Sequence, residues 1–181
     1  MPKLRKTTLK KHLNQFTKEE LVEEIMNLVK QQPMLEEYYI SLLTPNEEEI
    51  LNKYKKIIEK QFGDRGEVLR YPVIKQAIKD FSKVSTNKEQ IAEIMVFTVE
   101  CGVDFTRAYG DIDERFYLTV SSIYRQALEY IVKNDLEEIF VGRCRRLVER
   151  SQGIGWGFGD AMVEFYYDYL GHMEEEEETE D

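Results

Sequence analysis

Apolar residues recur every three or four positions along most of the chain, the spacing that places side chains on one face of an α-helix. The apolar faces lie at residues 9–16, 21–29, 38–43, 74–81, 91–99, 116–131, 136–148 and 160–170. The links between them are short, which favours antiparallel neighbours. The pattern predicts an all-α protein of about nine helices in antiparallel hairpins, packed as a bundle or as a short solenoid-like stack.

Helix boundaries and domain limits come from polar and glycine-containing positions. Thr17 followed by Glu20 has the form of a capping box, and the glycines at residues 63–66 mark a possible sub-boundary. Alternate helices in the second half begin about forty residues apart, as in helical repeats, although no tetratricopeptide or ankyrin pattern fits. We predict one helical domain over residues 1–172 and a disordered acidic tail over residues 173–181.

Charge is distributed unevenly along the chain. The formal net charge is −10, and the stretch 174–181 holds seven carboxylates, so that the remainder carries about −3. The first eighteen residues contain lysines and an arginine but no acid. This basic start makes weak nucleic-acid association one functional hypothesis, which the acidic balance of the whole chain opposes.

The residues that usually hold metals or form disulfides are few. Cys101 and Cys144 are the only cysteines, and His12 and His172 are the only histidines. We therefore expect no disulfide framework, no metal site and no cofactor. The chain also lacks a run of about eighteen apolar residues, which predicts a cytoplasmic protein without membrane insertion.

A glycine-rich stretch, SQGIGWGFGD, spans residues 151–160 and contains the only tryptophan. It does not fit the dinucleotide pattern G-x-G-x-x-G in either frame, and no glycine is followed by lysine as a phosphate-binding loop requires. The favoured interpretation is a corner between two helices, where Trp156 and Phe158 pack into the core. A loop that cradles a ligand is the alternative.

A second unusual stretch, DFTRAYGDIDE, spans Asp104 to Glu114. Several carboxylates beside Arg107 are suited to a metal or a cationic ligand, or to holding one carboxylic acid at a raised pKa. A calcium loop does not fit, because its third ligand position falls on Arg115. The favoured interpretation is structural: Asp111 or Asp113 caps the next helix, and Arg107 pairs with a nearby acid.

Alternating helix directions place these two stretches at the same end of the molecule. We therefore hypothesise that they form one shallow pocket. Its candidate residues are Asp104, Arg107, Tyr109, Asp111, Asp113, Trp156 and Asp160.

Four segments of the chain carry a family resemblance. They are TKEELVEEIMNLVK, TPNEEEILNKYKKII, VECGVDFTRAYGDIDERFY and SQGIGWGFGDAMVEFYYDY. Together they resemble an uncharacterised family of bacterial all-helical proteins, a domain of unknown function. The resemblance covers nearly the whole chain up to Leu170, and YGDID and GIGWGF are its most specific parts. It implies a single helical domain and supplies no catalytic residues.

Three functional hypotheses follow. The leading one is a non-enzymatic helical scaffold that binds another protein, because amphipathic helices are abundant and catalytic motifs are missing. The alternative is a small-ligand or metal-binding protein, or an enzyme, that uses the Asp104–Glu114 loop together with Trp156. Weak nucleic-acid association through the basic N-terminus is the third.

Overall fold

The computed structural model describes residues 3–43, 48–63 and 69–173. In these residues the chain forms nine α-helices and one short 3₁₀ helix, without a strand. The α-helices are α1 (Lys6–Leu13), α2 (Lys18–Gln31), α3 (Pro33–Leu43), α4 (Glu48–Glu59), α5 (Tyr71–Val84), α6 (Lys88–Tyr109), α7 (Glu114–Lys133), α8 (Glu137–Ser151) and α9 (Phe158–Leu170); the 3₁₀ helix η1 is Lys60–Phe62. The predicted all-α class is confirmed.

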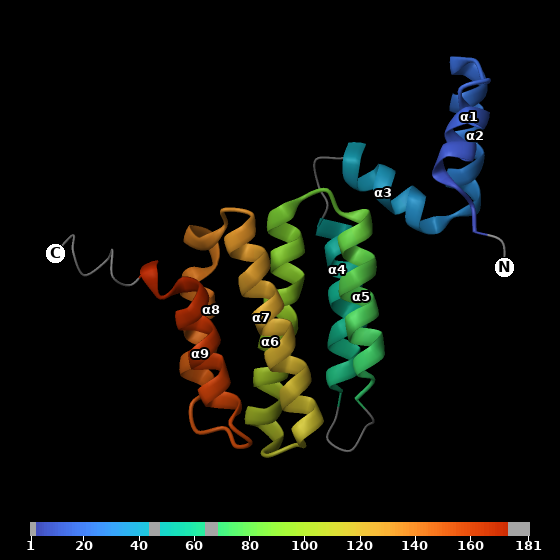
Figure 1. The fold of residues 1–181 in the computed structure, drawn as a ribbon. Helices are drawn as coiled ribbons and strands as arrows, with labels where there is room; N and C mark the ends of the chain where they lie inside the picture. Colours follow the sequence, from blue (N-terminus) through green and yellow to red (C-terminus); the bar gives the residue numbers. More distant parts are fainter. Residues whose placement is uncertain (1–2, 44–47, 64–68, 174–181) are drawn as a thin grey trace.

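Helices α4 to α9 run side by side as a bundle, the first of the two predicted arrangements (Figure 1). From α5 onward the links lie alternately at the two ends, so that successive helices are antiparallel. Helix α6 is central and contacts α4, α5, α7 and α8. The fully buried rings of Phe81, Phe116 and Tyr124 lie in the core of this bundle.

Gly102 sets the close approach of α6 to α7. A Cβ atom at this glycine would lie 2.8 Å from Cγ2 of Val120 on α7. Because no side chain intervenes, the two longest helices pack tightly against each other.

Several helices begin with a side-chain cap. The capping box predicted for α2 is present: the backbone N–H of Glu20 donates to Thr17 Oγ1 at 3.2 Å, and that of Thr17 donates to Glu20 Oε2 at 2.7 Å. Asn87 caps α6, where its Oδ1 accepts from the backbone N–H of Glu89 at 2.9 Å. These bonds satisfy amide groups that a helix start leaves without a partner.

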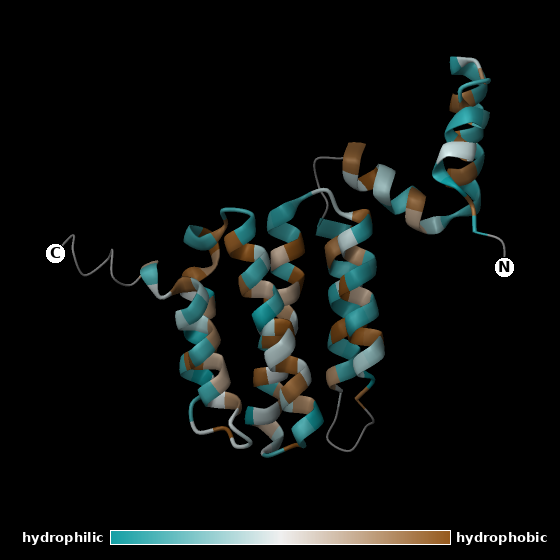
Figure 2. Ribbon diagram, viewed as in Figure 1, coloured by the Kyte–Doolittle hydropathy of each residue, from teal (hydrophilic) through white to brown (hydrophobic). Residues whose placement is uncertain are grey.

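Helices α1, α2 and α3 form an N-terminal arm, which projects from the bundle (Figure 1). Helix α3 joins the arm to the bundle through contacts with α5. The hydroxyl of Tyr54 on α4 also donates to Glu37 on α3 at 2.8 Å. Neither α1 nor α2 has a buried residue, although apolar positions continue along the arm (Figure 2).

One hydrophobic cluster extends from Ile50 on α4 to Leu170 on α9, with members on both sides of the possible sub-boundary at 63–66. Gly63 ends the 3₁₀ helix, and residues 64–68 lie outside the described residues. The acidic tail from residue 174 onward lies outside them as well. The sub-boundary and the disordered tail stay predictions.

Candidate functional site

The corner between α6 and α7 and the corner between α8 and α9 lie at the same end of the bundle (Figure 1). They contact each other: Trp156 Nε1 donates a hydrogen bond to Asp111 Oδ2 at 2.9 Å. We call residues 104–114 and 150–160 together the corner site. Alternating helix directions predict that the two corners share one end; that they form one pocket stays a prediction.

Arginines make the other contacts across the corner site. Arg107 Nη1 donates to the backbone carbonyl of Arg150 at 3.0 Å. The guanidinium of Arg150 in turn forms an ion pair with Asp104. The expectation that Arg107 pairs with an acid is therefore wrong, because its guanidinium reaches the carboxyl end of α8, where a backbone oxygen accepts it.

Asp111 is held in place by a tyrosine of α7. The hydroxyl of Tyr117 donates to Asp111 Oδ1 at 2.7 Å and accepts from the backbone N–H of Ile112 at 3.2 Å. Thr106 Oγ1 lies 2.8 Å from the same hydroxyl. Burial raises the pKa of Tyr117 above its ordinary value, and the hydrogen bond to Asp111 raises it further. The carboxylate of Asp111 therefore accepts one bond from Tyr117 and one from Trp156.

The two aromatic rings of the glycine stretch have opposite environments. Phe158 is 2% exposed and packs against Tyr117, with ring centroids 5.2 Å apart. Trp156 is 61% exposed, so the expectation that both rings pack into the core is wrong for Trp156. Its backbone is left-handed at φ 59°, and its indole N–H is bound to Asp111; together they leave the ring at the surface.

Two glycines of this stretch, Gly157 and Gly159, have structural roles at the start of α9. Gly157 is left-handed at φ 66°, as the N-cap of α9. A Cβ atom at Gly159 would lie 2.8 Å from the carbonyl oxygen of Ser151. A side chain at position 159 would thus separate the start of α9 from the end of α8.

The other candidate residues have local roles. Asp113 Oδ1 accepts from the backbone N–H of Phe116 at 2.7 Å, so Asp113 is the cap of α7 and Asp111 is not. Tyr109 is partly buried, with its ring 4.9 Å from that of Phe105. Asp160 is exposed in the first turn of α9. Whether the corner site binds a ligand stays a prediction.

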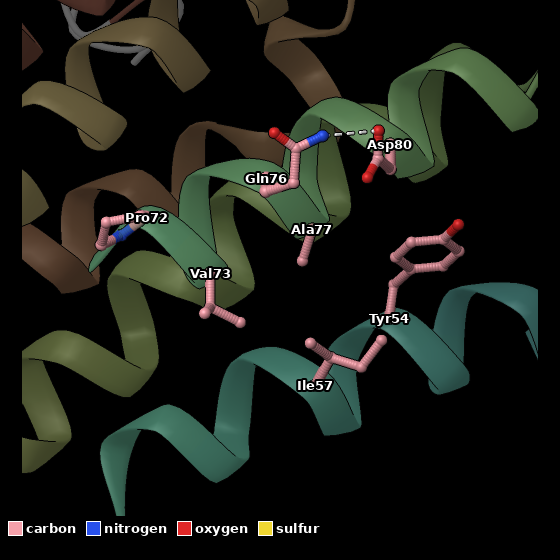
Figure 3. Close-up of a pocket in the computed structure, with 7 residues that line it drawn as sticks. All are labelled: Tyr54, Ile57, Pro72, Val73, Gln76, Ala77 and Asp80. Carbon is pink, nitrogen blue, oxygen red and sulfur yellow. Dashed lines mark hydrogen bonds between the residues drawn. The ribbon is translucent and has the colours of Figure 1, made fainter. Parts of the chain in front are cut away.

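A pocket of about 420 Å³ lies away from the corner site, between α4 and α5 (Figure 3). It is lined by Tyr54, Ile57, Pro72, Val73, Gln76, Ala77 and Asp80. Gln76 donates to Asp80 at 2.8 Å at one end of an otherwise apolar surface. Sequence reasoning missed this pocket, because its apolar members have the same spacing as core residues.

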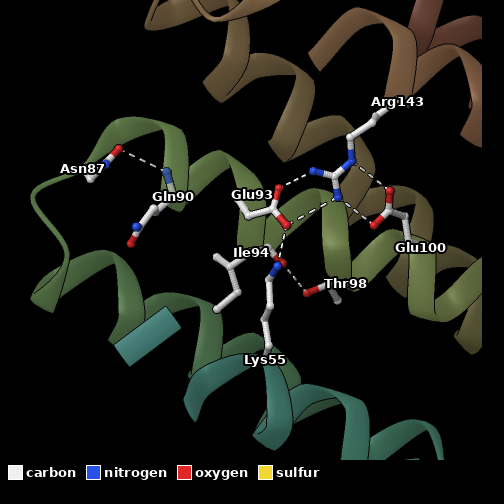
Figure 4. Close-up of polar contacts among 8 residues, drawn as sticks. All are labelled: Lys55, Asn87, Gln90, Glu93, Ile94, Thr98, Glu100 and Arg143. Atoms are coloured by element: carbon white, nitrogen blue, oxygen red, sulfur yellow. Dashed lines mark hydrogen bonds and ion pairs between the residues drawn. The ribbon is translucent and has the colours of Figure 1, made fainter. Parts of the chain in front are cut away.

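A half-buried ion-pair network joins α4, α6 and α8 (Figure 4). Arg143 donates to Glu100 through Nε at 3.0 Å and Nη2 at 2.7 Å, and it also pairs with Glu93. Lys55 is the second partner of Glu93. Burial acts to raise the pKa of Glu93, but the hydrogen bonds from Arg143 and Lys55 hold it below its ordinary value.

Sequence reasoning missed this network as well. The only available signal was the seven-residue spacing of Glu93 and Glu100, which puts both on one face of α6. The partner on α8 is distant in sequence and is brought close only by tertiary packing. The network is a connection between three helices within the bundle.

Neither cysteine is suited to be a nucleophile at neutral pH. Cys101 is partly buried and Cys144 is buried, and both are free thiols. Burial raises the pKa of each thiol to about 12. The reactive thiolate is therefore scarce at both positions. Among the described residues, no three or more His, Cys, Asp or Glu side chains gather so as to hold a metal ion.

Fold and site define an all-helical bundle protein with a projecting amphipathic arm and a hydrogen-bonded corner. The chain matches the model of a family of unknown function, DUF6155, over residues 4–177, and it belongs to that family. No curated protein and no solved structure matches it. Within the described part of the chain, no helix has the length and apolarity needed to cross a membrane.

Proposed function

We propose that this protein is a non-enzymatic helical scaffold that binds another protein through its N-terminal arm. Helix α2 carries the proposal. It is amphipathic, yet its apolar side chains stay in water: exposure is 52% at Val22, 43% at Ile25, 52% at Met26 and 43% at Leu28. Covering such a stripe with apolar atoms is favourable, because it removes apolar surface from water.

The attachment of the arm supports the same proposal. The backbone N–H of Thr86, after α5, donates to Ser41 Oγ on α3 at 3.2 Å, and Tyr54 holds Glu37. Beyond these contacts, α3 continues the exposed apolar surface at Leu42 and Leu43, which are 50% and 76% exposed. The bundle thus anchors the arm at one end and leaves α1 and α2 accessible to a partner.

A comparative pull-down tests the proposal. The bait proteins are the wild type, an arm variant with Val22→Ser and Met26→Ser, and a control with Leu118→Ser and Ile139→Ser. The control residues are 63% and 53% exposed on the bundle, so that both variants lose similar apolar surface. We expect the arm variant to lose proteins that the wild type and the control both capture. Identical capture by all three baits would contradict the proposal.

A second candidate function, ligand binding at the corner site, is favoured by one observation. The exposed ring of Trp156 is fixed by its bond to Asp111, and a fixed exposed aromatic face is suited to stacking or to a cation. Tryptophan fluorescence reports on this ring alone, since the chain has one tryptophan. A ligand should change the emission of the wild type and have less effect on Asp111→Ala. A flat titration across metal ions and metabolites would count against this function.

A further inference from the structure

The first two helices of the arm are opposite in charge. Residues 3–16 contain five basic residues and no acid, whereas α2 contains four glutamates and two lysines. No ion pair of the described residues involves a side chain of α1 or α2. Helices α1 and α2 therefore carry complementary charges outside these ion pairs, although Glu20 also accepts the capping bond from Thr17.

The two helices also share one spacing. Lys6, Leu9, Lys10 and Leu13 on α1 stand at the same intervals as Glu19, Val22, Glu23 and Met26 on α2. On each helix, two apolar residues four positions apart form a stripe, and two charged residues four positions apart lie along one edge of that stripe. The charged edge lies on the same side of the stripe in both helices. In an antiparallel helix pair these equivalent edges face each other, so the lysine edge of one α1 would meet the glutamate edge of an α2.

The same chain leaves most of this seam open. Leu9 is 39% exposed and Val22 and Met26 are each 52% exposed, while Leu13 is partly buried. Helix α1 has eight residues, none of them buried. Isolated helices below about 12–15 residues are marginal in water, so α1 gains most from a surface that covers it.

We propose that the arm binds a second copy of this chain, with α1 of each copy packed antiparallel on α2 of the other. Two-fold symmetry forms both α1–α2 contacts at once, because each chain supplies one basic helix, α1, and one acidic helix, α2. Lys6 and Lys10 of one copy pair with Glu23 and Glu19 of the other, around a seam of Leu9, Leu13, Val22 and Met26. This inference rests on the proposed function and specifies its partner.

Sedimentation velocity of the full chain tests the inference through a charge exchange. One variant carries Lys6→Glu and Lys10→Glu, and the other carries Glu19→Lys and Glu23→Lys. The wild type should approach twice the monomer mass as its concentration rises at low salt. It should dissociate at high salt, where charges are screened. Each variant alone should self-associate at least about tenfold more weakly, because every pair across the axis becomes repulsive.

Mixing the two variants is the decisive measurement. The mixture restores every opposite-charge pair, so a heterodimer should form at concentrations where each variant alone is monomeric. The matched control reverses Glu164 and Asp168, two exposed carboxylates four positions apart on α9, to lysine. It should dimerise like the wild type. Circular dichroism verifies that all variants keep their helices.

Three kinds of result would overturn the inference. The first is a wild type that stays monomeric at all concentrations at low salt. The second is a mixture that does not associate, or a reversed variant that dimerises as well as the wild type. The third is a monomer that shifts on adding duplex DNA and loses that shift with Lys6→Glu and Lys10→Glu, which assigns α1 to nucleic acid. If the chain is monomeric but arm-dependent capture persists in the pull-down, this inference fails and the proposed function stands.

Discussion

The arm and the bundle are built from the same kind of helix and differ in what covers it. Helix α7 in the bundle and α2 in the arm are both amphipathic, with apolar residues on one face. The face of α7 is buried, including Phe116, Val120 and Leu128, whereas α2 buries no residue. Amphipathic spacing therefore predicts that a helix has a face to cover, and tertiary packing decides whether the same chain covers it.

Because of this difference, we expect the bundle and the arm to differ in their stability against unfolding. The cooperative core lies in α4 to α9, where apolar side chains from all six helices meet. The arm contributes little buried surface, so its first two helices should open locally at lower cost than the bundle unfolds. The proposals above need such a region, because a surface that binds a partner must be accessible before binding.

The largest expected effect contrasts a core ring with an arm side chain. Phe116 is 0% exposed, so Phe116→Ala should lower the free energy of unfolding by about 3–5 kcal/mol. Val22→Ala should change it by no more than about 0.5 kcal/mol, because the side chain is already half in water. Urea unfolding at low protein concentration measures both values without a contribution from association. Equal losses would mean that α2 belongs to the same cooperative core.

Two glycines in the bundle differ in whether a neighbouring helix leaves room for a side chain. At Gly102 an added Cβ would lie 2.8 Å from Val120, so Gly102→Ala should destabilise by about 1–3 kcal/mol. At Gly142 on α8 the nearest atom is the Nη1 of Arg146 at 3.7 Å. Gly142→Ala should therefore stabilise by about 0.5–1 kcal/mol, since alanine favours the helix. Thermal melts of the two variants should move in opposite directions, and a shift in the same direction would contradict this account of the α6–α7 contact.

The helices could be predicted from the sequence because the spacing of apolar residues is a local property. The all-α class and the capping box at Thr17 depend on residues a few positions apart, and both are present. That Asp111 and Trp156 lie at the same end of the bundle could also be predicted from the sequence, because alternating helix directions bring alternate corners to one end. That inference needed topology but no side-chain detail.

What sequence reasoning missed depends on conformation and on distant partners. Trp156 and Phe158 are similar residues two positions apart, and only the left-handed backbone at Trp156 and its bond to Asp111 determine which ring is exposed. The partners of Arg143, Glu93 and Glu100, are 50 and 43 residues away in sequence, on another helix. No periodic pattern encodes either contact.

Acid should weaken the bundle through Glu93. Its pKa in the folded protein is lowered, so the carboxylate contributes stability at pH values above its ordinary pKa. That contribution is lost as the pH falls through the folded value. Glu93→Gln should cost about 1–2 kcal/mol at pH 7 and show a shallower loss of stability between about pH 5 and pH 3. Urea midpoints across this pH range measure it.

A glutamate of the arm provides the control for this pH dependence. Glu24→Gln on α2 removes a carboxylate from an exposed position, so stability at pH 7 should change by less than about 0.5 kcal/mol. If Glu93→Gln lost stability with acid as steeply as the wild type, the network would not be the source of the acid sensitivity.

The smallest effect is expected at Trp156, an exposed side chain within the bundle. Trp156→Gly loses the hydrogen bond to Asp111 but relieves the left-handed backbone, so the free energy of unfolding should change by less than about 1 kcal/mol. Phe158→Ala, two residues away, should cost about 3–5 kcal/mol, because that ring is buried. A loss above about 2 kcal/mol for Trp156→Gly would place the indole with the bundle core in energetic terms, despite its exposure. A near-neutral change would mean that Trp156 resembles the exposed side chains of the arm: it contributes little to the stability of the fold and is available for binding.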